Sequence, residues 1–258
     1  MTGDIDMALE CNIDAMAHWK LTLIVPILLL SGCVGNIQDQ PESNLNVNLD
    51  SNHGLIEISY EDGEITSTSF PTIGFDFSNS SNNIVQFGVN PGDGRATTTL
   101  EPSTGNVIEI EYQNHGLYNA TAFIINGDGT QENQTHQIQI DQRIEWYENN
   151  TGEPQSLTFD TNPGNEWPLP SHFFLNSTIE NPSFVDPDGR EVTVSWDIGN
   201  QEGICQTNNG EIENGELLEW RTIHFAPEGN HEIKLTIEDG QDRINVQHLV
   251  EIIYQTQS

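Results

Sequence analysis

The sequence predicts an all-β protein with two tandem β-sandwich domains that follow a signal region and a flexible tether. Short runs from Leu55 onward alternate apolar and polar residues, as in 55–60 (LIEISY), 106–112 (NVIEIEY) and 231–238 (HEIKLTIE). Gly, Asn, Asp or Pro separates such runs at intervals of about 8 to 12 residues, which is typical of a sandwich. A helical period is not sustained anywhere after the signal region.

The N-terminal region has the layout of an exported lipoprotein. Residues 21–30 read LTLIVPILLL after Lys20, and this run is too short to cross about 30 Å of hydrocarbon but typical of a signal peptide. The next residues, Leu30-Ser31-Gly32-Cys33, resemble a lipobox, which implies a signal region 1–32, cleavage before Cys33 and a lipid on that cysteine. The alternative is a buried apolar strand with an incidental cysteine.

The first fifteen residues differ from a signal peptide. They contain Asp4, Asp6, Glu10 and Asp14 and no basic residue, so we expect translation to begin at Met16. Residues 33–52 have few apolar residues and no period, which predicts a flexible tether between the lipid and the folded body. The expected location is the outer face of the cell membrane.

The charge balance excludes one class of partner. Seven Lys and Arg residues stand against 40 Asp and Glu residues, giving a formal net charge of −33. A basic face for nucleic acid cannot be assembled from this composition. Such acidity keeps a protein soluble in high or marine salt, and together with the lipobox it indicates a halophilic or marine prokaryote such as an archaeon.

An internal repeat predicts the domain organisation. Residues 112–127 (YQNHGLYNATAFIING) align without a gap on 225–240 (FAPEGNHEIKLTIEDG), with the aromatic residue and both glycines in register. We therefore expect one sandwich over 53–148 and a second over 167–258. The interdomain segment 149–166 is either a linker or contributes a strand through 157–159.

The second half resembles a PKD (polycystic-kidney-disease) domain over about residues 175–254. The motifs are 181–189 (NPSFVDPDG), 192–199 (VTVSWDIG), 224–229 (HFAPEG) and 233–240 (IKLTIEDG). The first half departs from this pattern, because Phe87-Gly88 stands where Trp-Asp is expected, and is PKD-like or generally immunoglobulin-like. The resemblance implies a seven-strand immunoglobulin-like sandwich of the kind found in surface proteins and beside secreted hydrolases. The residues expected to form the structural core are Trp196, Phe225 and Gly229.

The sequence contains candidate metal ligands and candidate glycosylation sites. Asp186, Asp188 and Asp197 offer oxygen ligands for Ca²⁺, although Asp is also an ordinary turn residue and Asp197 is equally suited to bond the following loop. Zinc is excluded because the histidines are isolated and Cys205 is expected to have no cysteine partner. Glycosylation sequons occur at Asn79, Asn119, Asn133, Asn149 and Asn176.

The candidate ligand-binding residues are aromatic. Trp146, Tyr147 and Trp167 lie in or beside the interdomain segment, where they either stack on sugars or cement the two sandwiches together. The sequence thus predicts a non-catalytic surface lipoprotein for adhesion, spacing or binding of a surface protein or glycan, without a resident cofactor. The alternatives are a ligand-capture lipoprotein that serves a transporter or secreted hydrolase, and an extracellular hydrolase with an unrecognised acid pair.

Overall fold

The computed structural model describes residues 6–7, 45–80, 83–165, 168–183, 190–240 and 242–255. Every regular element in these ranges is a β-strand, so the predicted all-β class is confirmed. None of the described segments forms a helix long and apolar enough to span a membrane.

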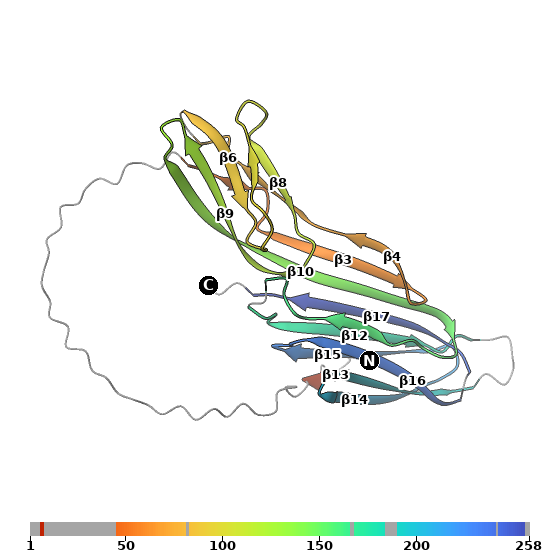
Figure 1. The fold of residues 1–258 in the computed structure, drawn as a ribbon. Coiled ribbons are helices and arrows are strands. Elements are labelled where there is room, and N and C mark those ends of the chain that lie inside the picture. The colour runs from red at the N-terminus through yellow and green to blue at the C-terminus, as the bar shows by residue number, and fades with distance from the viewer. Residues whose placement is uncertain are drawn as a thin grey trace, which may run out of the picture.

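The strands of the described residues form three sheets (Figure 1). The large sheet has the strand order β1 (Asp6–Met7), β15 (Leu217–Phe225), β12 (His172–Glu180), β17 (Ile244–Ile253), β10 (Gln131–Thr151), β9 (Gly116–Asn126), β6 (Ile84–Asn90) and β7 (Thr98–Leu100), with β3 (His53–Glu61) on β10 and β4 (Glu64–Ser69) on β3. The second sheet has the order β11 (Leu157–Asp160), β16 (Asn230–Gly240), β13 (Val192–Asn200) and β14 (Gly203–Ile212). The third has the order β2 (Asn48–Leu49), β5 (Thr72–Asp76) and β8 (Val107–Glu111).

Strand β10 belongs to both halves of the molecule. Its first part, 131–140, pairs with β9, and its second part, 142–151, pairs with β17. Figure 1 shows β10 running continuously from beside β9 to beside β17. The predicted domain boundary after residue 148 falls inside this strand, and the division into two domains stays a prediction.

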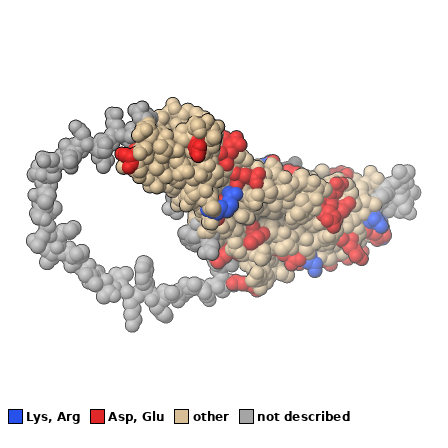
Figure 2. Space-filling model, turned by 45° about the horizontal axis from the view of Figure 1, so that its top comes forward, with Lys and Arg blue, Asp and Glu red and all other residues tan. Residues whose placement is uncertain are grey.

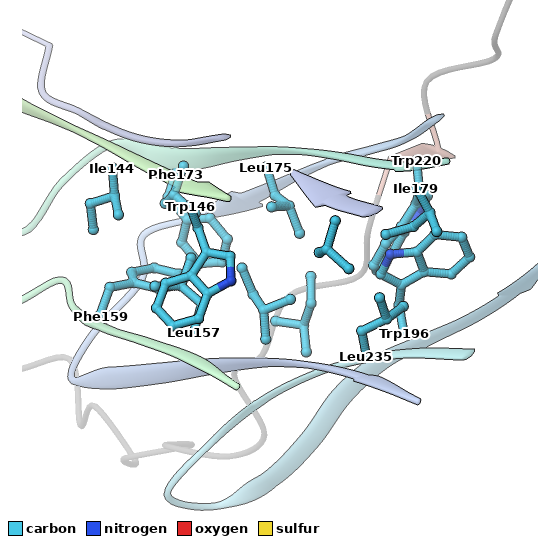
Figure 3. Packing of buried hydrophobic residues seen from close by; sticks show 14 of the residues in the cluster. Ile144, Trp146, Leu157, Phe159, Phe173, Leu175, Ile179, Trp196, Trp220 and Leu235 are labelled. Atoms are coloured by element: carbon cyan, nitrogen blue, oxygen red, sulfur yellow. The ribbon is translucent and has the colours of Figure 1, made fainter. Parts of the chain in front are cut away.

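Two hydrophobic cores lie on the large sheet. The first core contains Phe75, Tyr118, Ile124 and Ile138 and brings β5 of the three-stranded sheet together with β9 and β10. The second core contains Phe173, Trp196, Leu235 and Val250 and brings β13 and β16 together with β12 and β17 (Figure 3). Alternating burial along β12, β13 and β17 gives each of these strands one inward face.

The predicted tether is too long at its C-terminal end. Leu45 and Val47 are buried in the first core, and Asn48–Leu49 pair with β5. Ordered pairing and burial are incompatible with a flexible tether, so the prediction is wrong for residues 45–52. Residues 33–44 lie outside the described part of the chain.

Of the three residues expected in the structural core, one is buried, one is exposed and one lies in a turn. Trp196 is fully buried, and its Nε1–H donates a hydrogen bond of 2.7 Å to Ser177 Oγ on β12. The expectation that Phe225 lies in the core is wrong: its side chain is 52% exposed, because alternation along β15 turns His224 inward and Phe225 outward. Gly229 occupies a turn with φ +83°, a left-handed conformation that favours glycine.

The interdomain segment contributes to the second half. Residues 157–160 form β11, which pairs antiparallel with β16 from Leu157↔Ile233 to Asp160↔Asn230. Leu157 and Phe159 are buried in the second core. Of the two interpretations of 149–166, the strand is therefore the one observed.

Candidate functional site

The interdomain aromatic residues do not form a shared platform. Trp146 is 5% exposed, its Nε1–H donates to Glu148 Oε1 at 2.9 Å, and its ring lies 5.2 Å from that of Tyr60. Of the two roles left open for Trp146, stacking on sugars is wrong, because the ring is packed in the second core (Figure 3). Tyr147 is 39% exposed on the opposite face of β10. Trp167 lies outside the described residues.

Asp197 is the one proposed calcium ligand that lies in the described part of the chain. Asp186 and Asp188 lie outside it. Asp197 Oδ1 accepts a hydrogen bond of 2.7 Å from Thr207 Oγ1 on the neighbouring strand β14, instead of bonding the following loop. A group of three or more His, Cys, Asp or Glu side chains suited to a metal does not occur among the described residues.

Cys205 differs from what the sequence led us to expect. Cys205 is disulfide-bonded, so the expectation that it has no cysteine partner is wrong. The proposed lipidation site, Cys33, lies outside the described residues.

The glycosylation sequons differ in accessibility. Asn79, Asn119, Asn133 and Asn149 are exposed, whereas Asn176 on β12 is half-buried. The Oδ1 atom of Asn176 is buried in the sheet without a hydrogen-bond partner among the described residues. Asn176 is therefore the least accessible of the five sequons.

A polar pocket of about 380 Å³ opens at one end of the second core. It lies between the β13–β14 turn at 200–202, the β15–β16 connection at 225–230, and Asn162 after β11. Amide side chains and two carboxylates dominate its lining, and its described lining contains no Lys or Arg. The polar side chains are Asn162, Asn200, Gln201, Glu202, Glu228 and Asn230.

The β15–β16 connection is held in place by backbone and side-chain hydrogen bonds. Ala226 has φ +44°, and its N–H donates to the carbonyl of Ser171 at 2.9 Å. The N–H of Gly229 donates to Asn162 Oδ1 at 3.1 Å, and the carbonyl of Gly229 accepts hydrogen bonds from the N–H and the hydroxyl of Thr161, both at 3.0 Å. The connection is thus fixed to the segment that follows β11, which pre-organises the pocket wall.

The β13–β14 turn forms the opposite wall. Asn200 Oδ1 accepts a hydrogen bond of 2.9 Å from the N–H of Glu202. A side chain that bonds the backbone two residues further on is characteristic of an Asx turn. Both walls therefore have local structure of their own, independent of a ligand.

Two buried histidines also line the pocket. His224 and His231 are 5% and 2% exposed. The ring of His224 stacks on Phe173 at 4.6 Å and 12°, and the ring of His231 stacks on Phe159 at 5.7 Å and 21°. None of the four ring nitrogens has a hydrogen-bond partner among the described residues.

Burial keeps both imidazoles neutral. It lowers the pKa of His224 to about 4, and the neighbouring His231 lowers it further in the same direction. Burial also lowers the pKa of His231, although the charge of Asp160 opposes this effect. A neutral imidazole offers one donor and one acceptor, but all four ring nitrogens are buried, so other atoms of these two residues line the pocket.

Sequence reasoning missed these histidines because it treated them as isolated. Strict alternation along β15 (Trp220, Thr222, His224 inward) would have placed His224 in the core face. The repeat aligns His231 with Tyr118, another buried ring. Both signals depend on knowing that the strand ends at a pocket, which the sequence does not state.

A second, shallower pocket of about 260 Å³ lies between the halves of the molecule. Its lining includes Tyr60 of β3 and His115, together with Phe159 and Asp160 of β11. Both ring nitrogens of His115 have partners: Nδ1 with the Tyr254 hydroxyl at 2.8 Å, and Nε2 with the Asp160 carbonyl at 3.1 Å. This histidine joins the two halves and has no unused hydrogen-bonding group.

Comparisons with known proteins give no family. No family model matches the chain, and no curated protein matches it. Among solved structures, carbohydrate-binding modules of the β-sandwich superfamily align at 13% identity and a TM-score of 0.30, covering 78% of this chain and 94% of theirs. Fibronectin(III)-like modules of Clostridium thermocellum CbhA align at 16% identity and a TM-score of 0.25, covering 81% and 94%.

A third solved structure is the Bacteroides ovatus protein SGBP-B in complex with a mixed-linkage heptasaccharide. It aligns at 11% identity and a TM-score of 0.18, covering 76% of this chain and 52% of that chain. TM-scores this low do not show common ancestry with these structures, and the functions of those proteins are not assigned to this chain.

Proposed function

We propose that this protein binds glycans without catalysis, and that its site is the pocket between the β13–β14 turn and the β15–β16 connection. The observation that carries the proposal is a pre-organised polar pocket beside an exposed aromatic ring, that of Phe225. Sugar hydroxyls both donate and accept hydrogen bonds, as do the amides of Asn162, Asn200 and Asn230. The apolar C–H face of a sugar packs on an aromatic ring.

The setting of the two pocket carboxylates favours binding over hydrolysis. Glu202 and Glu228 line the pocket but are both exposed. A glycosidase needs a carboxylic acid kept protonated by an apolar setting, opposite a second carboxylate. Solvated carboxylates suit hydrogen bonding to hydroxyls better than proton transfer to a leaving group.

The cellular context completes the proposal. The lipobox-like residues ending at Cys33 support an exported protein that is lipid-anchored to the outer face of the membrane, with its PKD-like second half presenting the pocket. Adhesion or spacing at the cell surface is compatible with this arrangement. The rival interpretation, ligand capture for a transporter or hydrolase, predicts equally tight binding of short and long oligosaccharides.

The test is binding of the full-length protein in detergent to a panel of purified polysaccharides, measured by affinity electrophoresis and calorimetry. Phe225→Ala should weaken binding by about fivefold, because an exposed ring contributes about 1 kcal/mol to a stacked contact. The matched control is Tyr147→Ala, which removes another exposed ring of the large sheet and should leave binding unchanged. Absence of binding to every polysaccharide, or loss with Tyr147→Ala alone, would contradict the proposal.

A further inference from the structure

The larger pocket, at the end of the second core, and the shallower pocket, between the halves, meet at the surface. Asn162 lines both pockets. Asp160 lines the shallower pocket and is paired across β11 and β16 with Asn230, which lines the larger one. Cβ atoms of directly paired residues are about 4.5–5.5 Å apart, so these two side chains are neighbours. All three side chains are exposed, and the pockets are therefore joined along an accessible surface.

The position of β11 explains how the two pockets come together. Among the described strands β11 pairs only with β16, which makes it an edge of the four-stranded sheet. The larger pocket opens at the end of that sheet, and the shallower pocket lies beside its edge, opposite Tyr60 of β3 and Gln142 of β10. Residues 160–162 form the corner between the end and the edge. A ligand that occupies both pockets follows this corner.

The corner is fixed by hydrogen bonds on both sides. Towards the larger pocket, the N–H and the hydroxyl of Thr161 donate to the carbonyl of Gly229. Towards the shallower pocket, the N–H of Gly164 donates to the carbonyl of His115 at 2.9 Å, and the carbonyl of Asp160 lies 3.1 Å from His115 Nε2. A wall that is ordered before the ligand arrives lowers the entropic cost of binding.

We propose that the two pockets form one groove around Asn162, and that this groove binds an internal segment of a linear glycan, with sugar units of one chain in both pockets. The inference rests on the proposed glycan-binding function and adds the kind of ligand, a chain instead of a single sugar or a chain end. Thr158 and Asn114 at one end of the groove, and Gln201 and Glu202 at the other, are exposed. A bound chain can therefore continue beyond both pockets.

Both pockets offer the same kinds of contact to a sugar. In the shallower pocket the side chains of Asn114, Gln142 and Thr158 can donate and accept hydrogen bonds, as the amides of the larger pocket can. Each pocket also has an aromatic ring that is not fully buried, Tyr60 in the shallower one and Phe225 in the larger one. Repeated contacts of one kind suit a ligand built of repeated units.

The charges of the groove favour a neutral chain. Asp160, Glu202 and Glu228 line it, and the described lining of the two pockets contains no Lys or Arg. The protein carries a net charge of −33, and Figure 2 shows acidic side chains spread over one face with few basic ones among them. An anionic polysaccharide is repelled by such a surface, so neutral glycans are the appropriate probes.

The test is the dependence of affinity on chain length. The full-length protein in detergent is titrated by calorimetry with the disaccharide, tetrasaccharide and hexasaccharide of linear glucan, mannan and galactan. For the glycan that binds, the hexasaccharide should bind at least about tenfold more tightly than the disaccharide, because only the longer chain reaches both pockets. Reduction of the hexasaccharide at its reducing end should leave its affinity unchanged, since the groove holds an internal segment.

Variants of the shallower pocket locate the additional contacts. Thr158→Arg places a long side chain at an exposed position of this pocket and should lower the affinity for the hexasaccharide to that for the disaccharide, with disaccharide binding unchanged. Gln142→Ala should weaken hexasaccharide binding several-fold and leave disaccharide binding unchanged. The matched control is Thr98→Arg, at an exposed position of β7 that lines neither pocket, and it should have no effect.

Each measurement has an outcome against the proposal. Equal affinity for the disaccharide and the hexasaccharide, or loss of binding on reduction of the chain end, would overturn the inference and leave glycan binding intact. An unchanged dependence on length in folded Thr158→Arg and folded Gln142→Ala, or an equal loss in Thr98→Arg, would remove the shallower pocket from the site. No binding of any oligosaccharide or polysaccharide would overturn both this inference and the proposed function.

Discussion

The two copies of the sequence repeat end differently in the structure. Tyr112 and Tyr118, in the first copy, are buried with their rings 4.9 Å apart. The Tyr112 hydroxyl donates to the Pro91 carbonyl at 3.0 Å, and the Tyr118 hydroxyl lies 2.7 Å from the Asn114 carbonyl. Their counterparts in the second copy are Phe225, which is exposed, and His231, whose ring nitrogens have no partner among the described residues.

The strands that follow also differ. In the first half β9 and β10 form a hairpin within the large sheet, whereas in the second half β16 lies in the four-stranded sheet and β17 in the large sheet. The same alternating pattern thus serves two topologies. In the first copy the hydroxyls of Tyr112 and Tyr118 are hydrogen-bonded and their rings lie in the core. In the second copy Phe225 and His231 line a pocket, and the ring nitrogens of His231 have no hydrogen-bond partner among the described residues. The first copy thus packs its aromatic residues in the core, whereas the second copy contributes residues to a pocket wall.

The largest expected effect comes from the second core. Trp196 is buried and its indole N–H is hydrogen-bonded to Ser177. Like the tyrosines of the first half, it should therefore stabilise the fold. Trp196→Ala should lower the free energy of unfolding by about 3–5 kcal/mol, from lost burial and the remaining cavity. Chemical denaturation measures the change, and a loss below about 1 kcal/mol would break the assignment. Ser177→Ala, which leaves the indole N–H without its partner, should cost less.

Acid should weaken the second half more than the first. Burial lowers the pKa of His248 to about 4, below its ordinary value of 6.5. The unfolded chain therefore binds more protons than the folded chain between these values, so stability falls as the pH falls from 6.5 toward 4. The loss for this histidine is about 2 kcal/mol between pH 6.5 and 5.

The measurement is the difference between the wild type and His248→Leu in urea unfolding at both pH values. The variant should lose less stability on acidification. Hydrogen exchange should show β12 and β17 opening at a higher pH than β9, because the tyrosines at the end of the first core do not gain a charge in this range. A parallel loss in wild type and variant would show that His248 is not responsible.

The repeat itself offers a smaller and sharper test. Tyr118→Phe removes a hydroxyl with two carbonyl partners, at Asn114 and His115, and should cost about 1 kcal/mol. His231→Phe at the aligned position removes no hydrogen bond to a described residue and should cost nothing measurable. Equal losses at the two positions would make His231 a structural residue and abolish the distinction between the two ends.

The sequence predicted the periodic features well. Alternation along 192–199 and 231–238 follows from one buried face per strand, a local property, and both segments are strands. Pairing was beyond reach, because β17 and β3 meet β10 from distant parts of the chain. Which residues are buried at strand ends could not be predicted either. Phe225 and His224 are neighbours, and only the β15 register decides which of them points inward.

The candidate site was the part least accessible to sequence. Trp146 and Tyr147 were expected either to stack on sugars or to cement the two sandwiches together, but β10 continues through this position, buries Trp146 and leaves Tyr147 exposed. The pocket depends on three connections, after β11, β13 and β15, that come together only when two sheets pack. Amides and acids are so abundant in this sequence that their convergence left no local signal.

The smallest expected effect concerns the joint between the halves. Arg143 on β10 donates from Nη2 to Glu251 Oε1 of β17 at 2.7 Å, and its Nη1 lies 3.6 Å from Glu57 Oε1 of β3. Because the guanidinium is about one-third exposed, Arg143→Gln should cost only about 0.5 kcal/mol at low salt. The cost should vanish in 1 M salt, where the screening length is about 3 Å.

Arg221→Gln is the matched control for this joint. Arg221 pairs with Glu219 of its own strand at 2.8 Å, both well exposed, so its loss should change stability by less than the Arg143 variant does. If Arg143→Gln costs more than about 2 kcal/mol, or if its cost persists in high salt, the ion pairs hold the two halves together. A small, screened cost assigns that role to the continuous backbone of β10 and to the buried contacts of Trp146 with Tyr60 and of His115 with Tyr254.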